Sequence, residues 1–315
     1  MVSGTDQGLP YSKGLRASEL MMTGLSPARA YQIAERVEER LLERTAASVT
    51  RAELNDLTVE VMREVAGERY ATNFLNWEEV RALDVPIVVL IGGATGVGKS
   101  TLATQLAVRL NIVRVVATDA IREVMRAMLT EALMPTLYTS SFAAGDALRE
   151  PPGRSEDKVI VGFREQTAAV SVGIEALMER AALEGHSLII EGAHVVPGFF
   201  ELNRFSDRIL PVPAVVTVES EDIHRSHFVA RSTDASDRPF DRYVRGFAGI
   251  RRVQKYVKSQ ALSHEVPVVP NYSLDQALAA LIDLVVERAT ARLKGEAARR
   301  HPSVPRLGDL EEVRT

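Results

Sequence analysis

Val85-Pro-Ile-Val-Val-Leu-Ile-Gly-Gly-Ala-Thr-Gly-Val-Gly-Lys-Ser-Thr101 is the stretch that decides the fold. Residues 93–100 follow the phosphate-binding pattern G-x-x-x-x-G-K-[ST], and the apolar run before them is typical of a buried strand. The two middle glycines permit backbone dihedrals that other residues avoid, so successive N–H groups can converge on phosphate oxygens. An ordinary glycine-rich turn would have no reason to carry Lys99 and Ser100. The stretch therefore predicts a nucleotide-binding loop.

The chemistry of this loop predicts its cofactors. Lys99 would reach the β- and γ-phosphates of a nucleotide, and Ser100 would offer its hydroxyl to Mg²⁺. The N-terminus of the helix that should begin near Lys99 adds the positive end of a helix dipole. We therefore expect ATP and Mg²⁺. The residues expected to hold ATP are Gly93, Ala94, Thr95, Gly96, Val97, Gly98, Lys99, Ser100 and Thr101.

Composition excludes several classes of protein. The 315 residues are 46% hydrophobic and 25% charged, as in an ordinary globular protein of two domains or of one domain with an extension. A net charge of −4 gives no general reason to expect nucleic acid or an anionic membrane as partner. Cysteine is absent, which excludes disulfides and thiolate metal sites. The N-terminus lacks the apolar core of a signal peptide, and no apolar stretch is long enough to cross a membrane, so we expect a cytoplasmic protein. The sequence leaves open whether the protein forms a homo-oligomer.

Helical patterns precede the loop. Ser26 followed by Pro27 is a typical helix start, and Thr50 with Glu53 has the form of a capping box. We interpret 1–70 as a small helical module, 71–84 as a linker, 85–293 as the domain of the phosphate loop and 294–315 as a tail.

Strand and helix patterns alternate after the loop, as in an α/β fold whose parallel sheet is covered on both faces. Ligands bind such a sheet at the carboxyl ends of its strands, so residues just after each strand are the candidates for chemistry. We expect strands at 86–91, 113–117, 187–191, 213–219 and 266–270. We expect helices at 99–110, 119–133, 156–184, 240–262 and 273–293.

Three charged residues follow the second strand. Asp119 could accept a proton from an acceptor hydroxyl or hold a Mg²⁺-bound water, or it could simply stabilise a helix N-terminus. Arg122 and Arg126 lie one helical turn apart and could together bind an anionic acceptor. The alternative is that they form a solvated helix face.

The third strand ends with an acidic residue and a histidine nearby. Glu191 follows an apolar run and stands where P-loop folds place the carboxylate that orients the water shell of Mg²⁺. His194 lies close to it in sequence and is a candidate substrate ligand, although a single histidine in a turn is more often structural.

The segment after the fourth strand is basic. Arg231 and Arg238 flank a polar stretch between two helical patterns, and as part of a lid they could neutralise charge on a transferring phosphoryl group. Arg251, Arg252 and Lys255 are typical of a solvated helix face. The segment also contains Arg225, Arg242 and Arg245. At the last strand, Asn271 stands at the carboxyl edge, where an adenine could lie.

Several segments of the sequence together resemble those of a known protein family. They are the phosphate loop, Thr118-Asp119-x-x-Arg122-Glu123-Val124-Met125-Arg126, Leu133-Met134-Pro135-Thr136-Leu137, Ile190-Glu191-Gly192-Ala193-His194-Val195-Val196-Pro197-Gly198 and the closing strand from Val266 to Asn271. Together they resemble the 2-phosphoglycerate kinase family over about residues 85–290. The part from Leu9 to about Gly67 is similar to the ATP-cone, a nucleotide-binding regulatory module.

The resemblance implies ATP-dependent phosphorylation of the 3-hydroxyl of 2-phosphoglycerate, giving 2,3-bisphosphoglycerate and ADP. An acceptor that carries a phosphate and a carboxylate needs several cationic groups beside a base, which the arginines could supply. Two alternatives stay open. The same site could phosphorylate another small anionic acceptor, or the protein could be a nucleotide sensor that binds ATP without transferring a phosphoryl group.

Overall fold

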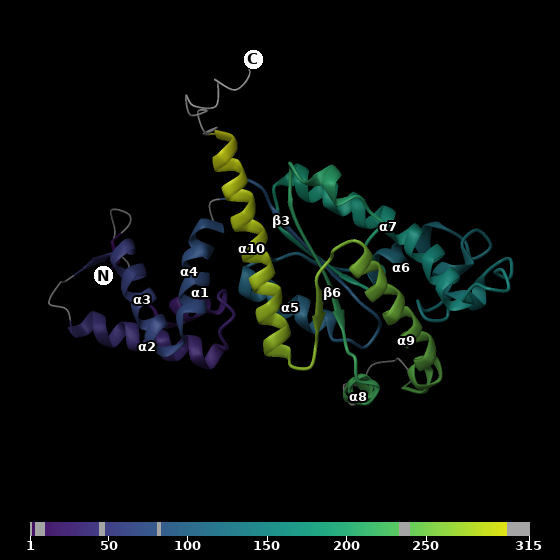
Figure 1. Cartoon of the computed structure of the whole chain (residues 1–315), viewed down its shortest axis with the longest axis horizontal. Coiled ribbons are helices and arrows are strands. Elements are labelled where there is room, and N and C mark those ends of the chain that lie inside the picture. Colours follow the sequence, from purple (N-terminus) through teal and green to yellow (C-terminus); the bar gives the residue numbers. More distant parts are fainter. Residues whose placement is uncertain (1, 4–9, 44–47, 81–82, 233–239, 301–315) are drawn as a thin grey trace, which may run out of the picture.

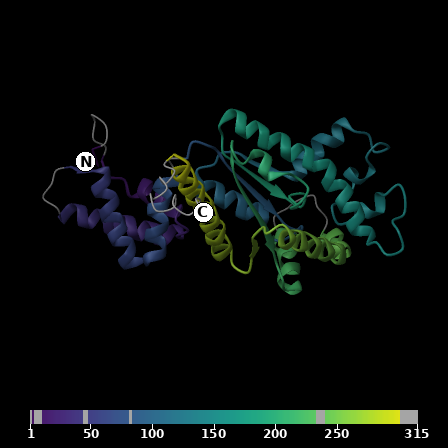
Figure 2. The same ribbon diagram turned by 45° about the horizontal axis from the view of Figure 1, so that its top comes forward.

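A computed structural model describes residues 2–3, 10–43, 48–80, 83–232 and 240–300 (Figure 1). Helices surround a central sheet, and a smaller group of helices near the N-terminus lies to one side of it (Figures 1 and 2). No helix in these described ranges is both long and apolar enough to cross a membrane.

The small N-terminal unit contains four helices, and its apolar residues form their own core cluster. The helices are α1 (Lys13–Met21), α2 (Pro27–Glu43), α3 (Arg51–Val65) and α4 (Glu68–Val80). Strand β1 (Val2–Ser3) pairs in parallel with β2 (Val49–Thr50). The predicted capping box is present, because Thr50 and Glu53 cap each other's backbone at the start of α3.

Helix α4 occupies most of the segment that we expected to be a linker. Phe74 packs in the core of the N-terminal unit, whereas Trp77 and Val80 pack in the large core of the sheet domain. The side chain of Asn73 donates to Oδ1 of Asp283 at 2.8 Å, and Arg69 pairs with the same carboxylate. The segment is thus a shared helix rather than an extended connection.

The central sheet confirms the predicted α/β class. Its five strands run parallel in the order β4-β5-β3-β6-β7, and β3 pairs with both β5 and β6. All five lie close to the predicted positions. They are β3 (Ile87–Gly92), β4 (Val115–Ala117), β5 (Leu188–Gly192), β6 (Leu210–Thr217) and β7 (Val268–Pro270).

Helices cover both faces of the sheet. Val89 and Ile91 of β3 pack in the same core cluster as helices α5 and α10, whereas Val88 and Leu90 pack in the cluster that includes α7. This division follows from the alternation of side chains along a strand. The helices are α5 (Lys99–Leu110), α6 (Thr118–Met128), α7 (Lys158–Glu184), α8 (Glu221–Ser232), α9 (Phe240–Ser263) and α10 (Leu274–Arg300).

The helix predictions failed in three places. Helix α6 ends at Met128, five residues before the expected end, and short 3-10 turns follow at η1 (Pro135–Tyr138) and η2 (Ala144–Ala147). Helix α8 had no predicted bounds, although a helix was expected before the polar stretch, because its charged and polar residues leave little apolar periodicity. Helix α10 runs on to Arg300, into the segment that we expected to be a tail.

Candidate active site

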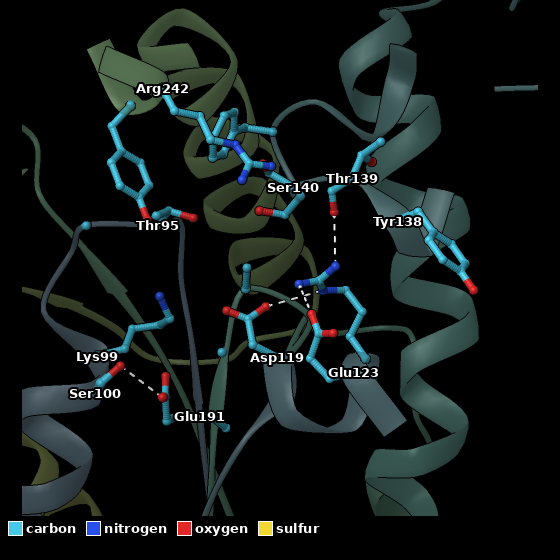
Figure 3. A pocket seen from close by; sticks show the side chains of 18 of the residues that line it. Thr95, Lys99, Ser100, Asp119, Glu123, Tyr138, Thr139, Ser140, Glu191 and Arg242 are labelled. Atoms are coloured by element: carbon cyan, nitrogen blue, oxygen red, sulfur yellow. Dashed lines mark hydrogen bonds and ion pairs between the residues drawn. The ribbon is translucent and has the colours of Figure 1, made fainter. Parts of the chain in front are cut away.

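A cavity of about 420 Å³ opens at the carboxyl ends of β3, β4 and β5, where a parallel sheet of this type binds its ligands. Two walls face each other across it (Figure 3). The phosphate-loop wall consists of Thr95, Gly96, Lys99 and Ser100. The arginine wall consists of Asp119, Arg122, Glu123, Arg126, Ser140 and Arg242.

The phosphate-loop wall has the predicted strand, loop and helix. Strand β3 ends at Gly92, and α5 begins at Lys99, whose side chain is only 7% exposed and donates to the carbonyl of Ala94 at 2.8 Å. Gly96 and Gly98 both have positive φ, as the phosphate-loop motif requires. On this side, the cavity is therefore bounded mainly by the backbone of the phosphate loop and by the buried ammonium group of Lys99.

The remaining residues predicted to hold ATP form the loop without lining the cavity with side chains. Ala94 and Val97 turn their side chains into the core beneath the loop. Gly93 lies against the carbonyl of Val216, and Thr101 is exposed in the first turn of α5. These positions can contribute only through their backbone amides or through the shape of the loop.

Ser100 and Glu191 meet at the floor of the cavity. The hydroxyl of Ser100 donates to Oε1 of Glu191 at 2.9 Å, and this carboxylate is almost buried at the end of β5. Hydroxyl and carboxylate oxygens are ligands that suit Mg²⁺, which takes its other ligands from phosphates and water. In the described ranges no three His, Cys, Asp or Glu side chains gather to form a closed metal cage. The pair thus fits an ion that is shared with a phosphate ligand.

The arginine wall is held together by its own contacts. Arg122 donates to the carbonyls of Leu137 and Thr139 at 2.7 and 3.2 Å and also pairs with Glu123. Its Nε lies 3.6 Å from Oδ1 of Asp119, whose side chain is 56% exposed. Asp119 therefore faces the cavity with an accessible carboxylate beside a fixed positive charge. It also stands in the first turn of α6, as the structural alternative supposed.

Arg126 lines the same wall. Its guanidinium donates to both carboxylate oxygens of Glu123 at 2.8 Å and lies over the ring of Tyr138, 4.7 Å from the ring centre. Arg122 and Arg126 are therefore not a solvated helix face. Part of their hydrogen-bonding capacity already serves to position η1 and Glu123.

The structure corrects the prediction for His194. This side chain is 1% exposed, outside the lining of the cavity, and its ring nitrogens contact Thr118 Oγ1 at 3.0 Å and Gln166 Oε1 at 2.8 Å. Burial, with opposing smaller effects of Asp119 and Arg122, lowers the pKa of His194 to about 4. A neutral, buried ring that does not line the cavity fits a supporting role behind it.

Asn271 also differs from its prediction. Its side chain is buried and donates from Nδ2 to the carbonyl of Val97 at 2.9 Å. It therefore contacts the back of the phosphate loop, and no adenine contact is needed to explain its position. The predicted lid residues cannot be placed, because the side chain of Arg231 and all of Arg238 lie outside the described residues.

Sequence reasoning missed other residues at the site. Arg242, in the first turn of α9, reaches the cavity and donates to Oγ of Ser140, while Tyr243 lines the cavity beside it. The sequence presents Arg242 only as one member of the basic segment after the fourth strand. Two histidines of α8, His224 and His227, contact the phosphate loop. The only signal for them was their spacing of three residues, which places them on one helix face.

Comparison with known proteins gives the family. No model of a protein family matches the chain. A 2-phosphoglycerate kinase of Methanothermobacter thermautotrophicus is 38% identical over 282 residues, covering 89% of this chain and 92% of that protein. The 2-phosphoglycerate kinases of Methanopyrus kandleri and Pyrococcus horikoshii are 38% and 35% identical and cover 91% and 93% of this chain, and 86% and 95% of their own lengths.

Solved structures show weaker likeness. A putative kinase from Chloroflexus aurantiacus aligns with a TM-score of 0.37 at 19% identity, over 65% of this chain and 99% of that one. A shikimate kinase from Bacteroides thetaiotaomicron aligns with a TM-score of 0.33 at 16% identity, over 66% of this chain and 98% of that one. The fold assignment rests instead on the strand order and on the loop described above. With full-length relatives at these identities, the chain belongs to the 2-phosphoglycerate kinase family and is a phosphotransferase with a P-loop kinase fold.

Proposed function

We propose that the protein transfers the γ-phosphoryl group of ATP to the 3-hydroxyl of 2-phosphoglycerate, giving 2,3-bisphosphoglycerate and ADP. One observation carries the proposal. A single cavity joins a phosphate-binding loop to an accessible carboxylate and several arginines. The names of the relatives supply the acceptor.

The phosphate-loop wall would hold the nucleotide. Backbone amides of the loop and the ammonium group of Lys99 would bind the β- and γ-phosphates, and the dipole of α5 would add to the positive potential. Ser100 and Glu191 would hold Mg²⁺, which when bound neutralises charge on the β- and γ-phosphate oxygens.

The arginine wall would bind and activate the acceptor. Asp119 would orient the 3-hydroxyl and accept its proton as the hydroxyl oxygen forms its bond to the γ-phosphorus. The bond from that phosphorus to the oxygen bridging it to the β-phosphate would break, and ADP would leave with the electron pair. Arg122, which lies beside Asp119, would keep this carboxylate near the reacting oxygen.

Cationic groups would select an anionic acceptor. Arg126 and Arg242 face the cavity from two helices, and a phosphate or carboxylate bound between them would receive charge-assisted hydrogen bonds. Arg231 and Arg238 are proposed to add charge around the transferring group. The arginines support the proposal of a small acid with a second anionic group as acceptor.

The test is ADP release over a panel of acids. We expect release with 2-phosphoglycerate and none with phosphoenolpyruvate, which carries the same two anionic groups but no hydroxyl to receive a phosphoryl group. 3-Phosphoglycerate tests whether the position of the acceptor's own phosphate matters. Glycerate tests whether the acceptor needs a phosphate at all. Lys99→Ala should abolish the acceptor-dependent release, and release that survives this change would contradict the mechanism. Faster release with a neutral acceptor would contradict the role of the arginines.

A further inference from the structure

Helix α8 contacts the phosphate loop through two histidines that do not line the cavity. Nε2 of His224 lies 2.8 Å from the carbonyl oxygen of Thr95, and Nδ1 of His227 lies 2.9 Å from the carbonyl oxygen of Gly96. Both rings project from the same face of the helix, three residues apart. Two consecutive peptide groups of the loop are therefore bound by one helix.

A third side chain continues the series. Nδ2 of Asn271 donates to the carbonyl of Val97 at 2.9 Å, and the backbone N–H of Asn271 donates to Thr217 at the end of β6 at 2.8 Å. The carbonyls on either side are also occupied: Ala94 accepts from Lys99 Nζ and Gly98 accepts from the N–H of Leu102. Five successive carbonyls of the loop thus have donors.

Because the peptide group is planar, these contacts to carbonyl oxygens also fix the direction of the N–H groups in the same peptide planes. In a trans peptide the C=O of one residue and the N–H of the next point in opposite directions. Donors on the carbonyls of residues 95, 96 and 97 therefore direct the N–H groups of Gly96, Val97 and Gly98 away from α8 and Asn271. Among the described residues, no hydrogen bond uses these three amides as donors. They remain available to an anion.

The proton positions agree with this arrangement. Arg251 donates from Nη1 toward Nδ1 of His224 at 3.3 Å and also to the carbonyl of Val218, so the ring proton of His224 lies on Nε2, facing Thr95. Burial is the largest cause that lowers the pKa of His224 to about 4. The hydrogen bond to Thr95 raises this pKa, and Arg251, His227 and Lys99 lower it. The ring is therefore neutral and has one defined donor.

The glycines of the loop explain how closely these groups approach. A Cβ at Gly96 would lie 2.3 Å from the ring of Phe228, which belongs to α8, and a Cβ at Gly98 would lie 2.4 Å from Nδ2 of Asn271. Both glycines also have positive φ. The outer face of the loop is therefore in direct contact with the helix and with Asn271 and has no room to rotate its peptide groups freely.

We propose that His224, His227 and Asn271 are positioning residues that fix three consecutive peptide planes of the phosphate loop, so that its amides face the nucleotide phosphates before ATP binds. Such preorganisation lowers the free energy of ordering the loop on binding. The proposal concerns nucleotide affinity alone. It can therefore fail while the proposed acceptor stands, and the reverse also holds.

The test separates hydrogen bonding from ring packing at His224. His224→Phe keeps an aromatic ring against Phe228 and Phe247 but removes the donor, whereas His224→Gln loses the ring and keeps a donor at similar reach. We expect His224→Phe to weaken ATP binding, measured by calorimetry with Mg²⁺, by about tenfold, and His224→Gln to stay within about threefold of the unaltered protein. The KM for ATP should rise while the KM for the acceptor stays constant. Normal affinity in His224→Phe, or equal losses in the two variants, would overturn the proposal.

Substitutions at two further positions keep the test independent of that site. His227→Leu and His227→Asn make the same comparison at a half-buried position, where removal of the donor should weaken ATP binding and the Asn variant should restore it. Asn271→Asp is nearly isosteric but turns an acceptor oxygen toward the carbonyl of Val97, so we expect the largest loss there. ATP affinity unchanged in both His227→Leu and Asn271→Asp would overturn the proposal. Tripolyphosphate, which lacks the nucleoside, should show the same order of losses.

Discussion

The phosphate-loop wall of the cavity is built from buried backbone, whereas the arginine wall is built from long charged side chains. Lys99 is 7% exposed and each carbonyl from Ala94 to Gly98 has a donor. Across the cavity, Asp119 is 56% exposed, Arg122 donates to the carbonyl of Leu137 and Arg126 donates to the carboxylate of Glu123.

The difference shows how one site can treat its two ligands differently. Backbone amides held by neighbouring groups recognise phosphates, which every nucleotide shares, and need little rearrangement. Side chains that pair with one another must exchange partners when an acceptor binds, so their contribution depends on the charge and shape of that acceptor. We therefore expect substitutions in the phosphate-loop wall to abolish turnover and substitutions of the arginines across the cavity to change acceptor selection.

Lys99→Ala should have the largest effect. Loss of the ammonium group removes charge stabilisation from the transferring phosphoryl group, and we expect kcat to fall by about 10³-fold or more. Steady-state ADP release measures this. Lys99→Arg is the control, because it keeps the charge but not the reach. Turnover within tenfold of normal in Lys99→Ala would show that the loop does not carry the chemistry.

Asp119→Asn should come next. The amide cannot accept the hydroxyl proton, so kcat should fall by about 10²-fold while ATP affinity, measured by calorimetry, stays unchanged. The loss of kcat in Asp119→Asn should be smaller at high pH, where hydroxide in the solvent can help to remove the proton of the acceptor hydroxyl. If kcat is unaffected, the carboxylate only stabilises the start of α6, which is its structural alternative.

Arg242→Gln should act on the acceptor alone. The exposed guanidinium contacts Ser140 and faces the cavity, so its loss should raise the KM for 2-phosphoglycerate by about tenfold and leave the KM for ATP within twofold. Arg252→Gln on the same helix, which pairs with Asp157 away from the cavity, is the matched control. Equal changes in both variants would remove Arg242 from acceptor binding.

The smallest effect concerns a feature that the two walls share. His224 lies behind the phosphate loop and His194 behind the arginine wall, and both are buried with pKa values lowered to about 4. Because the unfolded chain binds these protons near pH 6.5, the stability contributed by the neutral rings is complete above pH 6.5 and is lost as pH falls toward 4.

Between pH 7 and pH 5.5 we expect each of these histidines to lower the free energy of unfolding by about 1 kcal/mol. Urea unfolding at several pH values measures this slope. His224→Gln and His194→Gln should each remove the contribution of one histidine, about 1 kcal/mol, from this pH dependence of the free energy of unfolding. A slope that is the same in both variants as in the unaltered protein would contradict the assignment of neutral buried rings.

The sequence was sufficient for the parts of the site that depend on local pattern. A short apolar run followed by glycines, Lys99 and Ser100 identified strand, loop and helix, and Glu191 was expected beside Ser100 because acidic residues at a neighbouring strand end meet that loop. The sheet followed from alternation of strands and helices. These features require only periodicity and motif spacing.

The parts that failed depend on tertiary contacts. His194 stands near Glu191 in sequence but turns toward Thr118 and Gln166, and the side chain of Asn271 donates to the phosphate loop, a contact that the sequence did not predict. Helix α8 has little apolar periodicity, and it is stabilised by contacts such as that of Phe228 with the loop. A local pattern in one sequence cannot predict which residues, distant along the chain, a given side chain will contact in the folded protein.

The most direct test of the central claim is a ³¹P NMR spectrum of the products formed from ATP, Mg²⁺ and 2-phosphoglycerate. The account predicts that ADP appears together with an acid that carries two phosphomonoester signals in equal amounts. One signal is coupled to the single proton of C2 and the other to the two protons of C3. ADP accompanied by inorganic phosphate, or ATP and 2-phosphoglycerate left unchanged, would contradict it.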